Sequence, residues 1–161
     1  NGLRVPGIWN SFEAGVRAIL GQQVSVAAAK KLVTDFVHTL GETSKTNDDS
    51  ILRYFPEPKD VLESDLCFFR MPQSRKDTIH RFAHYMLNDS SPDDVDRWID
   101  IKGIGPWTVA YVKMRAVKDP DVWLIGDVGI KNALKLLDYE LDVDACKPWR
   151  SYLSMQLWNQ L

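Results

Sequence analysis

The segment IKGIGPWT at residues 101–108 has residue types and a spacing that suit the binding of an anion. Gly103 and Gly105 allow positive φ angles and let another backbone approach closely. Pro106 predicts the start of a helix, whose unpaired N–H groups and dipole favour a negative charge at that end. Lys102 adds long-range attraction, so the segment can hold a DNA phosphate without any base being read.

Both this turn and the nearby Asp127 also have a simpler interpretation. Glycine is common in tight turns between helices, and on the two glycines alone a plain turn is the favoured prediction. Asp127 precedes a predicted helix, where aspartate often caps the first N–H groups. A fixed carboxylate can instead stabilise positive charge that develops during a reaction. The residue types by themselves favour the cap.

Helices must position these residues, because apolar side chains recur at helical spacing through nearly the whole chain. Asn10 with Glu13 resembles a capping box, and Ser25 can cap a second helix that Gly41 ends. The predicted helices lie near residues 11–20, 26–40, 58–62, 72–86, 92–99, 106–117, 127–137 and 148–157. Their apolar faces also include three residues near helix ends, Trp9, Ile99 and Val117. No strand-like alternation competes, so the predicted fold class is all-α.

The composition of the 161-residue chain excludes several classes of protein. Two cysteines are too few for a disulfide framework or a four-cysteine cluster, and no apolar run is long enough to cross a bilayer. A net charge of −2 argues against a general polyanion binder. Residues 101–118 nevertheless allow one basic patch, because they contain four cations and no acid: Lys102, Lys113, Arg115 and Lys118. On charge alone, solvated faces are the favoured interpretation of this run.

The motifs from residue 101 to Asp127 resemble the helix-hairpin-helix base-excision DNA glycosylase superfamily (HhH-GPD). Within it they are similar to the bacterial DNA-3-methyladenine glycosylase II branch. Three further stretches match that branch, RAILGQ at 17–22, VSVA at 24–27 and KPWRSY at 147–152. The resemblance implies a helical core over residues 1–161, made of two lobes with the active-site cleft between them. It places the helix-hairpin-helix motif at about residues 92–117.

The resemblance assigns Asp127 as the catalytic carboxylate. Loss of a base leaves positive charge on the sugar, which a fixed carboxylate stabilises while it orients or deprotonates the attacking water. Relatives with lyase activity carry a lysine two residues after the second hairpin glycine, where this chain has Trp107. We therefore expect a monofunctional enzyme that hydrolyses the N-glycosidic bond without cutting the strand.

Three aromatic residues match the family's base pocket: Trp107, Tyr111 and Trp158. Electron-rich rings favour cationic bases such as 3-methyladenine and 7-methylguanine, so alkylated purines are the expected substrates. The alternative is that these rings only fill the core, as most aromatic residues at helical spacing do. Lys131, one turn after Asp127, is interpreted as a phosphate or salt-bridge partner.

The DNA contacts implied by the resemblance lie in the hairpin and in one loop: Lys102, Gly103, Ile104, Gly105, Thr108 and Gln23. Gln23 stands where close relatives place the leucine that fills the gap left by a flipped base. No metal or cofactor is expected for catalysis, with a monovalent cation at the hairpin carbonyls as a family possibility. The expected partner is double-stranded DNA with damaged bases, bound by a monomer in the cytoplasm or the nucleus and not at a membrane.

The sequence departs from the family in lacking the N-terminal β domain of close relatives, so we expect a fragment of a longer chain. Lys102 replaces a proline that is common before the first hairpin glycine. Two other functions stay open at this point. One is a glycosylase for oxidised or deaminated bases, and the other is a non-catalytic hairpin module that only binds DNA.

Overall fold

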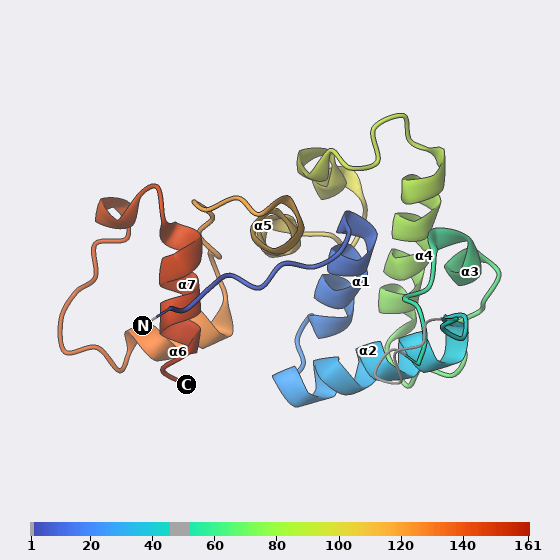
Figure 1. The fold of residues 1–161 in the computed structure, drawn as a ribbon, viewed down its shortest axis with the longest axis horizontal. Coiled ribbons are helices and arrows are strands. Elements are labelled where there is room, and N and C mark those ends of the chain that lie inside the picture. The colour runs from blue at the N-terminus through green and yellow to red at the C-terminus, as the bar shows by residue number, and fades with distance from the viewer. Residues whose placement is uncertain (1, 46–51) are drawn as a thin grey trace.

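The computed structural model describes residues 2–45 and 52–161, and in these residues the fold is all-α, as predicted. One lobe contains α1 (Ser11–Gly21), α2 (Val26–Leu40), α3 (Pro58–Leu62), α4 (Gln73–Asn88) and the 3-10 helix η1 (Val95–Asp100). The other contains α6 (Val128–Leu134), the 3-10 helix η3 (Asp144–Cys146) and α7 (Arg150–Trp158). Between them lies α5 (Pro106–Val112), continued by the π-helix η2 (Lys113–Val117) (Figure 1). No helix of the described residues is long and apolar enough to span a membrane.

Each lobe has its own hydrophobic core, and the α5–η2 segment contributes to both. Val112 is buried with the aromatic residues of the first lobe, whereas Met114 is buried with Leu124, Ile130 and Leu157 of the second. A helix shared by two cores fixes the lobes relative to each other and exposes its remaining side chains at their boundary. This boundary is where the site described below lies.

An extended N-terminal segment also joins the lobes. Val5 packs on the core of the second lobe and Ile8 on that of the first. The Ile8 backbone N–H donates to the carbonyl of Arg115 at 2.8 Å, which holds the segment against η2. Figure 1 shows this segment running from beside α7 to the start of α1.

The caps of α1 and α2 confirm where the sequence predicts these two helices to begin. The Asn10 side chain accepts from the Glu13 N–H at 2.7 Å, and the Ser25 hydroxyl accepts from the Ala28 N–H at 3.2 Å. These side chains satisfy N–H groups that have no partner within the helix. The polar composition of residues 43–50 predicts an exposed loop, which lies outside the described residues from residue 46 onward.

Several predicted helix ends were wrong, for reasons of local geometry. The segment predicted as a helix from residue 92 is a 3-10 turn from Val95, and its three-residue period turns Ile99, 46% exposed, away from the buried Trp98. The π-helix places Val117 in solvent, and Trp9 lies before the cap of α1, where helical spacing does not apply. The last helix begins two residues later than predicted, at Arg150.

Candidate functional site

The Asp127 carboxylate lies at the N-terminus of α6 and caps it. Its Oδ1 accepts from the Ile130 backbone N–H at 2.8 Å. The capping interpretation of the sequence is therefore correct in geometry. A cap uses only part of a carboxylate, and the side chain of Asp127 has two further partners.

Two tryptophan indoles donate to this carboxylate from different helices. Trp158 Nε1 of α7 donates to Oδ1 at 2.9 Å, and Trp107 Nε1 of α5 donates to Oδ2 at 3.0 Å. None of the ion pairs within residues 2–45 and 52–161 involves Asp127. Neutral donors orient a carboxylate without placing a positive charge beside it. Because Asp127 is only half-buried, a ligand can approach from solvent.

The rim around Asp127 is apolar and open. Its neighbours Ile125 and Val128 are 77% and 69% exposed, which is high for large aliphatic side chains. Gly126 between them has φ +86°, in the left-handed region that favours glycine. Exposed apolar residues beside a charged group are typical of a binding surface rather than of a solvated loop.

Trp107, Tyr111 and Arg115 form a column at four-residue spacing along α5 and η2. The rings of Trp107 and Tyr111 stack with centroids 5.2 Å apart, and the Arg115 guanidinium lies 5.5 Å from the centroid of Tyr111. Helical spacing puts Trp107 and Arg115 on opposite sides of Tyr111. Both faces of Tyr111 are thus occupied. Within the described part of the chain, the second face of Trp107 has no contact with another ring or a cation.

The hairpin confirms one of the two glycine predictions and corrects the other. Gly103 has φ +102°, and a Cβ atom there would overlap with the Thr78 side chain, so the position requires glycine twice over. Gly105 has φ −116°, which is extended backbone open to any residue, and a Cβ there would meet nothing within 4 Å. The positive φ that glycine allows is therefore used at Gly103 and not at Gly105.

Two of the hairpin carbonyls already accept hydrogen bonds from side chains. Arg81 Nε donates to the Lys102 carbonyl at 3.1 Å, and Gln22 Nε2 donates to the Gly103 carbonyl at 3.1 Å. A cation beside these oxygens would be repelled by the Arg81 guanidinium. The geometry thus gives no support to a cation at these two atoms.

The remaining hairpin residues divide between solvent and core. Lys102 is exposed, whereas Ile104 and Thr108 are buried, the latter accepting from Gln22 Nε2 at 3.3 Å. Any contact of Ile104 or Thr108 with DNA therefore falls to the backbone in this arrangement. Lys113 forms an ion pair with Asp96 at 2.5 Å, so the four cations of residues 101–118 do not act as one free basic patch.

Gln23 lies exposed at the end of α1 with φ +56°, a conformation that residues other than glycine rarely adopt. Gln22 before it is held at both ends: its side chain reaches the hairpin, and its carbonyl accepts from Arg75 at 2.6 Å. Gln22 and Arg75 thus present Gln23 beside the hairpin. Sequence reasoning missed this function of both residues, although Gln22 lies within the RAILGQ stretch.

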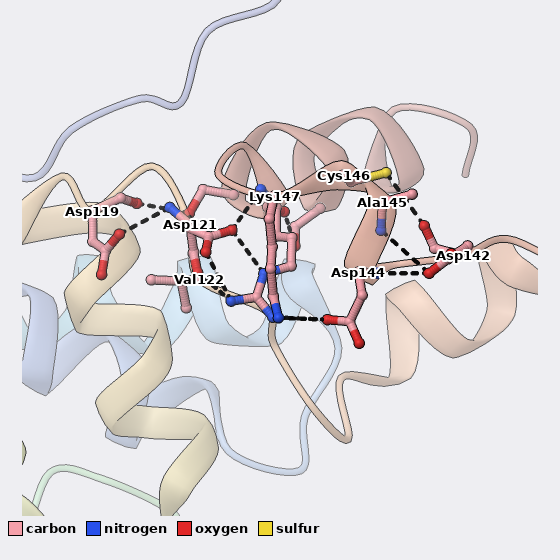
Figure 2. Close-up of polar contacts among 11 residues, drawn as sticks. Asp119, Asp121, Val122, Asp142, Asp144, Ala145, Cys146 and Lys147 are labelled. Carbon is pink, nitrogen blue, oxygen red and sulfur yellow. Dashed lines mark hydrogen bonds and ion pairs between the residues drawn. The ribbon is translucent and has the colours of Figure 1, made fainter.

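The KPWRSY stretch fixes α7, and with it Trp158, to the loop before α6. Arg150 binds Asp121 through Nε at 2.7 Å and through a terminal nitrogen at 2.9 Å. The Ser151 hydroxyl donates to the Asp119 carbonyl at 2.7 Å and accepts from the Val122 N–H at 3.0 Å. Within the loop, the Asp121 N–H donates to Asp119 Oδ1 at 2.8 Å (Figure 2). The hydrogen bond from Arg150 lowers the pKa of Asp121 below its ordinary value. Charge and backbone contacts therefore hold the start of this helix in place.

The comparisons with known proteins agree with this geometry. No family model matches the chain. The DNA-3-methyladenine glycosylase 2 of Escherichia coli is 34% identical over 98% of this chain and 60% of its own length. The structure of the Schizosaccharomyces pombe 3-methyladenine DNA glycosylase in complex with abasic DNA matches with a TM-score of 0.74, at 21% identity, over 99% of this chain and 84% of that one. The chain is thus similar in sequence to DNA-3-methyladenine glycosylases and shares the fold of a solved DNA glycosylase.

This similarity leaves the lesion open. A Clostridium acetobutylicum 8-oxoguanine glycosylase/lyase structure matches with a TM-score of 0.77, at 12% identity, over 99% of this chain and 61% of that one. The same helical glycosylase fold thus occurs with different named activities. The chain spans less than two thirds of the length of the Escherichia coli relative.

Proposed function

We propose that the chain is a monofunctional DNA glycosylase that removes alkylated purines from duplex DNA, as a step of base excision repair. The observation that carries this proposal is the Asp127 carboxylate, which the indoles of Trp107 and Trp158 orient at the lobe boundary. The sequence similarity to a DNA-3-methyladenine glycosylase over nearly the whole chain supports it.

Asp127 acts on the sugar of a nucleotide that has been flipped out of the duplex. As the N-glycosidic bond breaks, its electron pair leaves with the base and positive charge develops on the deoxyribose. The carboxylate stabilises this charge, and water adds to the sugar carbon while losing a proton. Oδ2 is the better candidate to face the sugar, because it accepts one hydrogen bond whereas Oδ1 accepts two.

Strand cleavage is not part of the proposed reaction. A lyase needs an amine that attacks the sugar and forms a Schiff base. Position 107 holds an indole that donates to Asp127, and Lys131 lies exposed on α6 after that carboxylate. The product is therefore an abasic site on an intact strand.

Alkylated purines are the proposed substrates because a cationic base leaves as a neutral molecule and needs only modest help. The free face of Trp107 and the ring of Trp158 would stack on such a base. Tyr111 would contribute its edge and hydroxyl, since Trp107 and Arg115 cover its faces. Recognition would then depend on charge and stacking more than on a fixed set of hydrogen bonds.

Double-stranded DNA is the proposed partner, held by the hairpin at its backbone and by Gln23 at the gap left by the flipped base. A monomer suffices, because every group in this mechanism comes from one chain. No cofactor is required, since water and a carboxylate complete the balance of the reaction. The proposed place of action is wherever the DNA lies, in the cytoplasm or the nucleus.

The test is release of base from duplexes that carry 3-methyladenine, 7-methylguanine, 8-oxoguanine or uracil. Asp127→Asn should slow release of methylated purines at least about a hundredfold. Asparagine also caps helices, so folding and DNA affinity should be kept. Asp138→Asn is a matched control, because Asp138 is an exposed acid of the same lobe.

The outcomes separate the proposal from its alternatives. Release of 8-oxoguanine or uracil in preference to methylated purines would indicate the glycosylase for oxidised or deaminated bases. DNA binding with no release of any base would indicate the non-catalytic module. Strand breaks without heat or alkali would contradict the monofunctional reaction.

A further inference from the structure

Gly129 lies within α6, where glycine normally weakens a helix. Its φ is not in the left-handed region, so backbone conformation does not explain the glycine. The space around the residue explains why it is a glycine. A Cβ atom at this position would lie 3.1 Å from Asp127 Oδ1 and 3.1 Å from both Cδ1 and Nε1 of Trp158.

These are the atoms that form one of the three hydrogen bonds to the carboxylate. Trp158 Nε1 donates to Asp127 Oδ1 at 2.9 Å, and a Cβ at Gly129 would press on donor and acceptor together. Such separations are tighter than nine in ten real Cβ contacts, so one of the partners would have to move by a few tenths of an ångström.

The surrounding structure limits which partner can move. Asp127 is held by its cap to Ile130 and by Trp107. The backbone of α7 is held by Arg150 at its start and by the buried Leu157 next to Trp158. The movement therefore falls on the indole of Trp158 itself, and it takes Nε1 away from Oδ1.

We propose that Gly129 is a positioning residue. Because it has no side chain, it leaves the space in which the Trp158 indole donates its hydrogen bond to Asp127. This inference rests on the proposed function, because it assigns Gly129 an effect on the rate of base release. It also predicts that a side chain at Gly129 changes the hydrogen bond itself, and this change can be measured without any reaction.

The first test compares Gly129→Ala with Asn132→Ala, a change at an exposed position of the same helix. Alanine favours a helix over either residue, so Asn132→Ala should unfold at no lower temperature than wild type. In Gly129→Ala this gain offsets part of the lost hydrogen bond, so the variant should still fold, as its circular dichroism would show. Gly129→Ala should slow base release on saturating DNA by about tenfold, because a hydrogen bond to a charged group is lost. Its Kd for duplex DNA should be unchanged, and Asn132→Ala should match wild type in both measurements.

The second test is a double-mutant cycle with Trp158→Phe, which has no N–H to donate. If Gly129 acts through this donor, Gly129→Ala should slow the Trp158→Phe enzyme much less than it slows wild type. An equal tenfold effect in both backgrounds would overturn the inference, as would a Gly129→Ala enzyme as fast as wild type.

An NMR measurement separates this inference from the proposed function. The indole Nε1–H resonance of Trp158, assigned by its loss in Trp158→Phe, should shift in Gly129→Ala and stay in place in Asn132→Ala. A shift in a protein that releases no base would sustain the positioning role while the proposed function fails. No shift in Gly129→Ala would overturn the positioning role whatever the activity.

Discussion

At the scale of the residue, Trp107 uses different parts of one side chain for different purposes. Its N–H orients Asp127, and one ring face stacks on Tyr111. In the proposed function, the other face stacks on the base. Because these contacts involve separate atoms, a substitution can remove one and keep the others.

Trp107→Phe should remove the hydrogen bond to Oδ2 and keep a ring that stacks on Tyr111. We expect base release to slow by roughly tenfold or more, the effect of losing one donor to a charged acceptor. DNA affinity should change little. Single-turnover kinetics would measure this, with Trp123→Phe as a control, since Trp123 makes no hydrogen bond to Asp127. Equal rates in Trp107→Phe and wild type would mean that the N–H plays no part.

At the scale of the element, the turn between η1 and α5 is held by its surroundings as much as by its own residues. Thr78 of α4 confines Gly103. The Lys102 carbonyl accepts from Arg81 of α4, and the Gly103 carbonyl accepts from Gln22 at the end of α1. The hairpin is therefore a rigid platform fixed to the first lobe. Its two glycines have different functions, and this difference supplies a matched pair of variants.

Gly103→Ala should destabilise the protein and weaken its binding to every DNA sequence alike, whereas Gly105→Ala should do neither. Alanine at a positive φ costs about 1–2 kcal/mol, and at Gly103 the overlap with Thr78 adds to this cost. Urea unfolding and titration with duplexes of unrelated sequence would measure both effects. Similar behaviour of the two variants would contradict the assigned geometry.

At the scale of the whole molecule, the site joins the second lobe to the helix that both cores share. Trp107 comes from the helix shared by the lobes, whereas Asp127 and Trp158 belong to the second lobe. The second lobe has a small core, and the ion pair of Arg150 with Asp121 adds a polar attachment that depends on pH. Acid should therefore loosen the lobe that carries Asp127.

The pKa of Asp121 is lowered in the folded protein by its hydrogen bond with Arg150. A lowered pKa contributes stability above the ordinary value of an aspartate, about 4, and this stability is lost as the pH falls through the folded pKa. Asp121→Asn should therefore lower Tm at pH 7 and weaken the loss of Tm on acidification below about pH 4. Thermal unfolding from pH 3 to 7 would show this, with Asp138→Asn following wild type. Parallel curves for Asp121→Asn and wild type would contradict the prediction.

The sequence by itself determined the features that depend on neighbours along the chain. Helical periodicity predicted the all-α fold, Asn10 and Ser25 were recognisable as caps, and the residues from 101 to Asp127 were sufficient to indicate the family. Each of these rests on a spacing of a few residues. Such spacings do not change when the chain folds.

Only the tertiary structure decided which atoms meet. The two indoles on Asp127 come from positions 20 residues before it and 31 after it. The space at Gly129, the cover on both faces of Tyr111 and the attachment of Gln22 to the hairpin likewise join distant segments. The sequence does not distinguish a glycine that allows a positive φ, as at Gly103, from one that leaves space for a neighbouring side chain, as at Gly129. The difference depends on what packs against it, and packing is set by the whole fold.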